Sequence, residues 1–441
     1  MTRARRVLHL AAAILVAHLP VSSVPAAQVT IVKAGRLLDV QTGRVEKNLR
    51  IRVEGTTIAA VGADLPIPAG ARLVDLSAAL VLPGLIDSHT HVCLAPEDAQ
   101  KSPVLYKTHA SRAVYGVKAA QDAMNAGFTT LRDLDNEGAD MADIAVRDAI
   151  RNGLFPGPRL FVAGWALSIT AGHMNVTGLS PSVDRRVDQL AIMTDSPEAM
   201  VRAVREQAKA GVDIIKIYTT GTLRHIDRRT MEPIPQMCTS EVRLIVDEAA
   251  RWRLDVAAHA YGGIGARNAA EGGVRSIEHG MFLDDTTLAL MKKMGTWWVP
   301  TMSVYLPDAA TPPADVAFHE TIGSMHKDTF RRAMKAGVRI AFGTDIGSMP
   351  HGEGWRELAL MTGYGMPPID AIRSATLEAA ALLRREAELG RIAPGFRADI
   401  IAVEGDPLAD MTALQRIRFV MVDGKIVRDE STKTDAPAER P

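Results

Sequence analysis

The stretch Leu85-Ile86-Asp87-Ser88-His89-Thr90-His91 begins as a short apolar strand and ends in two histidines. Side chains of a strand alternate between its two faces, so His89 and His91 share one face. Neutral imidazole is the commonest side-chain ligand for metals. A lone pair of histidines is more often hydrogen-bonded or solvated, so its meaning depends on what else the chain brings to the same place.

Seven more strand-sized runs follow, with amphipathic helical stretches such as 197–210, 240–253 and 314–336 between them. This alternation predicts a parallel sheet, and eight units over roughly 260 residues favour a closed (β/α)8 barrel over an open sheet. In that fold, the chemistry lies at the C-terminal ends of the strands. The predicted strands are Leu85–His91, Phe128–Asp133, Arg159–Ala163, Val212–Tyr218, Asp255–His259, Val274–His279, Thr296–Thr301 and Val338–Asp345.

Short strands and glycine turns flank this region on both sides, with Asp423-Gly424 as a hairpin turn near the end. One small β-sandwich domain built from both ends explains the two flanks most simply. We therefore predict residues 28–81 and 389–429 as the two parts of the sandwich and 82–388 as the barrel. Residues 430–441 are polar and are predicted to be a disordered tail.

The first 27 residues combine a basic start, a short apolar run and small residues, which is typical of a secretory signal peptide. We therefore expect a periplasmic or secreted protein with no membrane span after cleavage. Lys+Arg and Asp+Glu both number 51, which gives no electrostatic argument for nucleic acid as a partner. Two cysteines, Cys93 and Cys238, are too few for a disulfide framework.

Further ligand-type residues stand at or near the ends of other predicted strands. Lys216 lies inside an apolar strand, where an unpaired ammonium is costly and needs a structural or chemical reason. His259, His279 and Asp345 lie at the ends of the fifth, sixth and eighth strands. Such convergence on one end of a barrel is hard to explain by packing alone, and it indicates a metal-dependent site.

These motifs resemble the amidohydrolase superfamily. The run from Leu82 to His91 is similar to its opening motif, Lys216, His259, His279 and Asp345 follow in its order, and the run from Leu389 to Ile400 resembles its return to the β-domain. The resemblance covers residues 33–427. It implies two divalent metal ions, for which zinc suits the ligands.

By this resemblance, His89, His91 and Asp345 hold one metal, His259 and His279 hold the other, and carboxylated Lys216 bridges both. The resemblance implies that a hydroxide shared by the metals attacks an amide carbonyl. Asp345 would take its proton and deliver it to the leaving nitrogen. It also implies a homo-oligomer.

Within the superfamily, the chain resembles the Xaa-Pro dipeptidases, or prolidase-like members, in the motifs around His173, Tyr261 and His351. The resemblance implies that His173 and Tyr261 contact the substrate near the scissile carbonyl, as catalytic and substrate-binding residues. His351 and Arg224 are further candidates for substrate binding, although a turn cap and a solvated loop explain them as well. Met174 and Asn175 replace a typical Gly-Asp pair, which predicts a more apolar pocket. The predicted substrate is a dipeptide or N-acyl amino acid with a free carboxylate.

Three alternatives remain open. A lactonase or phosphotriesterase would use the same metal pair, and only a substrate panel separates it. A mononuclear deaminase or imidazolone-type hydrolase would not need Lys216. An inactive binding protein should have lost a ligand, and all six ligand positions are present.

Overall fold

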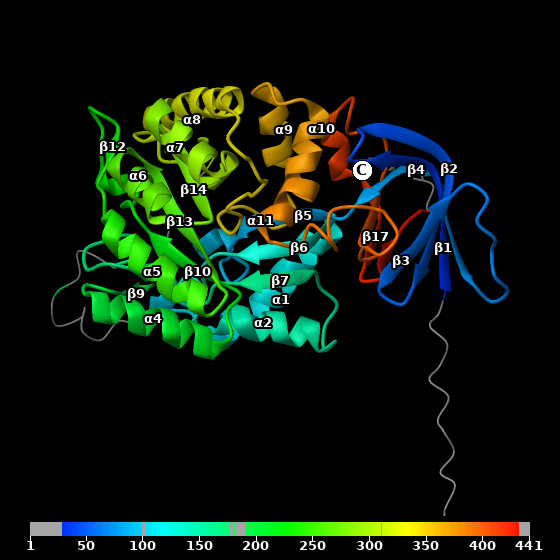
Figure 1. Ribbon diagram of the computed structural model, residues 1–441, viewed down its shortest axis with the longest axis horizontal. Helices are drawn as coiled ribbons and strands as arrows, with labels where there is room; N and C mark the ends of the chain where they lie inside the picture. The colour runs from blue at the N-terminus through cyan, green and yellow to red at the C-terminus, as the bar shows by residue number, and fades with distance from the viewer. Residues whose placement is uncertain (1–28, 99–102, 176–179, 181–189, 310, 432–441) are drawn as a thin grey trace, which may run out of the picture.

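The computed structural model describes residues 29–98, 103–175, 180, 190–309 and 311–431. The predicted signal peptide, residues 1–27, and most of the predicted tail, residues 432–441, lie outside the described residues. Figure 1 shows two parts, a barrel with helices around it and a β-sheet beside it that contains both the first and the last strands. Among the described residues, no helix is long and apolar enough to cross a bilayer.

The β-sheet beside the barrel has seven strands in the order β18-β17-β16-β4-β1-β2-β3. Its far edge curls round, because the backbone N–H of Ile58 in β3 donates to Phe396 just before β16. Inward-facing apolar side chains such as Val32, Ile51 and Phe419 are thereby buried within the sheet's own curve. The strands are β1 Val29–Asp39, β2 Arg44–Glu54, β3 Thr57–Gly62, β4 Arg72–Pro83, β16 Ile400–Val403, β17 Ile417–Val422 and β18 Lys425–Asp429.

Seven regular parallel strands form most of the barrel wall, and nearly all their residues are buried. They are β5 Leu85–Thr90, β6 Phe128–Asp133, β7 Arg159–Val162, β10 Ile214–Tyr218, β13 Asp255–Gly262, β14 Ser276–Phe282 and β15 Trp297–Val299. Short pieces add to the edges, namely β8 Leu167–Ser168 and β9 Ile192–Met193, and the pair β11 Ile226–Asp227 and β12 Glu232–Pro233 lies in a loop.

The predicted eighth strand, Val338–Asp345, is wrong as a regular strand. The segment forms only isolated bridges, from Ile340 to Trp298 and from Ile346 to Thr90. It nevertheless bonds to both neighbours, since Ala341 N donates to Trp298 O and Ser88 N donates to Phe342 O. The segment therefore closes the (β/α)8 barrel without a continuous ladder.

Helices surround the barrel and bury their apolar faces against it (Figure 1). Local signals set many of their ends: Ser196 caps α4, which Gly211 ends in a left-handed conformation. The helices are α1 His109–Asn125, α2 Ala142–Arg151, α4 Pro197–Ala210, α5 Thr239–Arg251, α6 Gly263–Gly272, α7 Asp285–Met294, α8 Val316–Ala336, α9 Trp355–Gly363, α10 Pro368–Arg373 and α11 Ala379–Leu382. A π-helical turn, η5 Ser374–Glu378, joins the last two, and the 3-10 turns are η1 Pro96–Asp98, η2 Pro103–Leu105, η3 Leu223–His225, η4 Ser303–Tyr305 and η6 Met411–Gln415.

The sheet and the barrel meet at Gly84. Strand β4 continues to Pro83, two residues beyond the predicted boundary at 81, and β5 begins at Leu85. A Cβ atom at Gly84 would lie 2.1 Å from the Thr129 hydroxyl oxygen, so only glycine fits this crossing. The short connection fixes the direction in which β5 enters the barrel.

Candidate metal centre

Four of the predicted ligands lie within direct reach of one another. The Lys216 Nζ atom lies 3.4 Å from His89 Nε2, and Asp345 Oδ1 lies 3.4 Å from the same nitrogen. Asp345 Oδ1 is also 3.0 Å from His91 Nε2. The ligand atoms of His89, His91 and Asp345 lie within 4.8 Å of one another. Residues from β5, β10 and the closing segment thus meet at one end of the barrel.

The remaining two predicted ligands complete this group. The rings of His89 and His279 are 4.9 Å apart between centroids, and those of His279 and His259 are 4.7 Å apart. His279 Nδ1 lies 2.8 Å from the Thr301 hydroxyl, and His259 Nε2 lies 3.4 Å from the carbonyl oxygen of Gly221. Within the described part of the chain, no hydrogen bond occupies His279 Nε2 or His259 Nδ1, so both nitrogens are available as ligand atoms.

The protonation preferences of the buried groups fit a cation site. Burial lowers the pKa of His89, His259 and His279 well below the usual value, which favours the neutral imidazole that metals bind. Burial also lowers the pKa of His91, but Asp345 and Glu137 outweigh it and raise that pKa to about 10. His91 therefore favours its protonated form beside Asp345, and a divalent cation bound by the two side chains would replace that proton.

Lys216 is 1% exposed and lies in an apolar strand. Burial lowers the pKa of its amine, against the opposing charges of Glu278 and Asp345. The pKa of Asp345 is raised by burial, but His89 and His91 outweigh this and bring it below the ordinary value. The site therefore combines a lysine biased toward the neutral amine with a carboxylate that stays ionised.

The predicted substrate residues lie in different places. The His173 ring stacks on Tyr218 and lies 4.1 Å from the His259 ring, and burial lowers the pKa of His173 to about 3. The Tyr261 ring lies 4.5 Å from that of His259. Both residues thus border the ligand group.

Among the described residues, neither His351 nor Arg224 contacts the side chain of a predicted ligand through a hydrogen bond or ion pair. His351 is buried, and its Nε2 atom lies 3.3 Å from the carbonyl oxygen of His91. It therefore supports the backbone behind a ligand. Arg224 is exposed on η3, in the loop after β10. Met174, which replaces the typical glycine of the prolidase-like motif, packs on the apolar cluster around Tyr218.

Sequence reasoning missed several polar residues that contact the ligands. Glu278 Oε2 lies 2.9 Å from His89 Nδ1, Asp135 O lies 3.2 Å from His91 Nδ1, and Thr301 contacts His279. The Tyr305 ring lies 5.6 Å from that of His279 and 5.8 Å from that of Tyr261 between centroids. Glu278, like Lys216, is a charged residue inside an apolar strand, and this signal in the sequence could have identified it.

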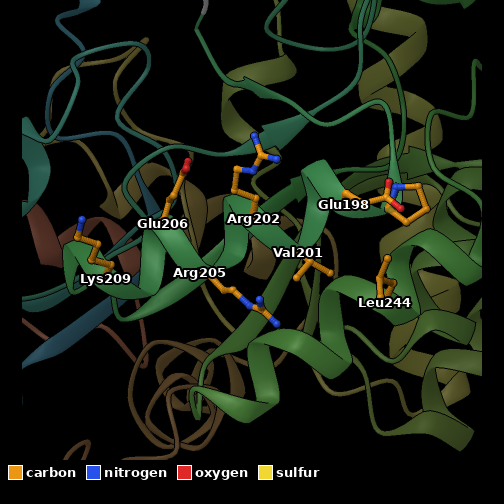
Figure 2. A pocket seen from close by; sticks show the side chains of 8 residues that line it. Glu198, Val201, Arg202, Arg205, Glu206, Lys209 and Leu244 are labelled. Carbon is orange, nitrogen blue, oxygen red and sulfur yellow. The ribbon is translucent and has the colours of Figure 1, made fainter.

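Figure 2 shows a groove elsewhere, along the outer face of α4. Charged side chains of that helix, including Arg202, Arg205 and Glu206, line it together with Leu244 of α5. Arg205 pairs with Glu248 of α5 at 2.8 Å. None of the groove's lining residues belongs to the ligand group inside the barrel.

The model of the Amidohydrolase family matches residues 80–427 of the chain. The chain belongs to the amidohydrolase family. The match includes all six predicted ligands, the barrel and most of the C-terminal strands of the sheet.

Two prolidase-like structures and a fungal enzyme are similar to this amidohydrolase over almost its full length. A Xaa-Pro dipeptidase with bound methionine in its active site is 33% identical, with a TM-score of 0.81, over 91% of this chain and 100% of that chain. A prolidase complexed with N-methylphosphonate-L-proline is 29% identical, with a TM-score of 0.79, over the same shares. Ochratoxinase from Aspergillus niger is 31% identical over 91% of this chain and 86% of its own length.

These findings confirm the resemblance to prolidase-like amidohydrolases and the predicted fold class. The amidohydrolase is a hydrolase that acts on amide bonds.

Proposed function

We propose that this amidohydrolase holds two divalent metal ions and cleaves a dipeptide or an N-acyl amino acid with a free carboxylate. The observation that carries the proposal is the meeting of six ligand-type side chains at one end of the barrel. His89, His91 and Asp345 would hold one ion and His259 and His279 the other, with carboxylated Lys216 between them. When bound, the ions supply polarisation of the scissile carbonyl and a water of lowered pKa.

Lys216 would become a ligand by carboxylation. The neutral amine, favoured by burial, forms an N–C bond with CO2 and loses a proton, which gives a carbamate with one negative charge. This change replaces a buried cation by an anion beside three imidazoles, and it removes the cost of the buried ammonium.

Asp345 is the proposed proton carrier. Because its pKa lies below the ordinary value, it is ionised before the reaction and can accept a proton at Oδ1 or Oδ2. The same carboxyl group can then donate this proton to the leaving nitrogen. Its position between His89 and His91 keeps it at the centre of the ligand group.

Tyr261 would bind the substrate. Its ring lies 5.8 Å from those of His279 and Tyr305 between centroids, at the border of the ligand group, and a phenol hydroxyl can donate a hydrogen bond to a substrate oxygen. Met281, Ile322 and Ile226 pack around these two tyrosines. This apolar cluster supports a substrate with a hydrophobic acyl side chain. The methionine bound to one prolidase-like structure and the N-methylphosphonate-L-proline bound to the other support a free carboxylate.

A metal count followed by a substrate panel tests the proposal. We expect two ions per chain in purified protein, and hydrolysis of dipeptides and N-acyl amino acids that a chelator abolishes. A lactone and a phosphotriester in the same panel test the alternative bonds. A single ion per chain together with deamination of an aminated heterocycle would reject the dinuclear peptidase.

We also propose that residues 1–27 direct export to the periplasm or the medium, where the mature enzyme assembles as a homo-oligomer. Fractionation of cells that express the full chain, with N-terminal sequencing, should find the mature protein outside the cytoplasm and cleaved near Ala27. Size-exclusion chromatography with light scattering measures the number of subunits. An uncleaved cytoplasmic protein contradicts the export proposal.

A further inference from the structure

A buried ion pair crosses the interior of the barrel below the candidate metal centre. Arg132 of β6 and Glu278 of β14 are 1% and 0% exposed in their side chains. Arg132 Nη2 donates to both carboxylate oxygens of Glu278, at 3.0 and 3.1 Å. Strands β6 and β14 are the second and the sixth of the eight, so they face each other across the barrel.

The guanidinium has further partners on both sides. Its Nη1 atom donates to the Ser276 hydroxyl at 3.0 Å, and its Nε atom donates to the carbonyl oxygen of Ser88. The Ser276 hydroxyl donates in turn to Glu278 Oε1. Arg132 thus holds the Glu278 carboxylate in one orientation and also hydrogen-bonds the backbone of β5, the strand that carries His89.

The second oxygen of Glu278 reaches a predicted metal ligand. Glu278 Oε2 lies 2.9 Å from His89 Nδ1, and a carboxylate can only accept, so Nδ1 carries the hydrogen. The other nitrogen, Nε2, is then an unprotonated acceptor. It faces Lys216 Nζ and Asp345 Oδ1, each at 3.4 Å.

We propose that Glu278 is a positioning residue that fixes the tautomer and ring orientation of His89 for metal binding, and that Arg132 holds Glu278 in place. This inference rests on the proposed metal-dependent function. Carboxylates bonded to the far nitrogen of a ligating histidine are known to strengthen metal sites.

A purely structural ion pair predicts a different response to mutation. Replacing both members of a buried pair by apolar residues is often neutral for stability, whereas removing one member leaves a buried charge. The double variant Arg132→Met with Glu278→Met should therefore keep the metal-free fold. It removes Glu278, the one hydrogen-bond partner of His89 Nδ1 among the described residues, so metal binding should weaken.

The test compares wild type, this double variant, Glu278→Gln and a control, Glu248→Gln. Glu248 is also a little-exposed glutamate paired with an arginine, but it lies on α5 outside the barrel. For each metal-free protein, cobalt(II) affinity is measured by competition with a chromophoric chelator, and Tm by calorimetry. We expect about 10- to 100-fold weaker cobalt binding in the double variant. Glu278→Gln should also weaken it, while Glu248→Gln should bind as wild type does.

Each outcome decides the inference. Wild-type cobalt affinity in the double variant, or in Glu278→Gln if the double variant does not fold, overturns it. Equal weakening in Glu248→Gln overturns it too, because the effect would not be specific to His89. A wild-type protein that binds no cobalt rejects the proposed function itself, and the positioning role falls with it.

Discussion

Three residues at the site, His279, Thr301 and Asp345, hold a left-handed backbone conformation, with φ of 71°, 49° and 59°. This conformation costs a non-glycine residue of order 1 kcal/mol or more, most for β-branched threonine. At His279 it has a visible use. Adjacent strand residues normally face opposite sides, yet Glu278 and His279 both reach the His89 ring. Backbone strain therefore brings ligands and their partners to one side.

Lys216 provides the sharpest test at the scale of one residue. The variant Lys216→Ala should lose metal and at least 100-fold in kcat/KM, because the bridging anion is gone. Bicarbonate with a short carboxylic acid should restore part of both, since it places a carboxylate in the vacated space. Metal content and hydrolysis rate measure the effect, and full activity without the additive would refute the bridge.

Tyr261 tests the proposed substrate contact. Tyr261→Phe removes one hydroxyl and should lower kcat/KM about 10-fold, the effect of a lost hydrogen bond of about 1.4 kcal/mol. Metal content should not change, because the hydroxyl is not among the predicted ligands. Tyr364→Phe, on a half-buried tyrosine at the end of α9, serves as control. Equal losses in the two variants would exclude a contact specific to Tyr261.

At the scale of the element, the sequence predicts best what is locally determined. The range Pro197–Ala210 is predicted and observed, because the cap Ser196, the proline at the first turn and Gly211 all act within that helix. The absence of a regular strand at Val338–Asp345 could not be predicted from such local signals. The segment's apolar run reads as a strand, but the pairing that makes a ladder is set by neighbours far away in sequence.

The cap of α7 should give the fold a small dependence on pH. Asp284 Oδ1 accepts from Thr287 N at 2.7 Å. Burial raises the pKa of Asp284, but the bonds from Thr287 and the charge of Arg267 outweigh it and bring the pKa below 3.8. A folded-state pKa below the unfolded value stabilises the protein above that unfolded value, and the gain is lost as the pH falls through the folded pKa.

Asp284→Ala should therefore lower the free energy of unfolding by about 1 kcal/mol at neutral pH. The difference from wild type should shrink as the pH falls below 3.8. Asp284→Asn keeps a capping oxygen but loses the charge, so its loss at neutral pH should be smaller, and its difference from wild type should shrink over the same pH range. Urea unfolding at several pH values measures all three proteins, and a loss in the alanine variant that does not change with pH would contradict the argument.

At the scale of the whole molecule, the sequence pattern indicates that both chain ends form one β-unit, because strand-sized runs there are separated by glycine turns, whereas those in the middle alternate with amphipathic helices. The sequence also brings His89, Lys216 and Asp345 to one end of the barrel, since parallel strands have their carboxyl ends together. It does not predict the ion pairs that join the sheet to the barrel, because these depend on side-chain reach across the assembled surface.

Arg159, at the start of β7, forms two of these ion pairs. Its Nη1 atom lies 2.8 Å from Asp399 Oδ2, and its Nη2 atom lies 2.6 Å from Asp423 Oδ1. Arg159 and Asp399 are 18% and 8% exposed in their side chains. Removing one partner of a largely buried pair leaves an uncompensated charge, which costs about 3 kcal/mol.

Arg159→Met should lower the free energy of unfolding by this amount, whereas Arg397→Met should cost less than about 1 kcal/mol. Arg397 also contacts Asp423, at 3.3 Å, but its side chain is 36% exposed. Because β7 begins at the opposite end of the barrel from the ligands, hydrolysis per folded, metal-loaded molecule should stay near the wild-type rate in both variants. Equal losses of stability, measured by chemical unfolding, would show that burial does not decide the strength of this link. If Arg159→Met instead loses metal as Lys216→Ala is expected to do, contact between the sheet and the barrel affects metal binding at the site.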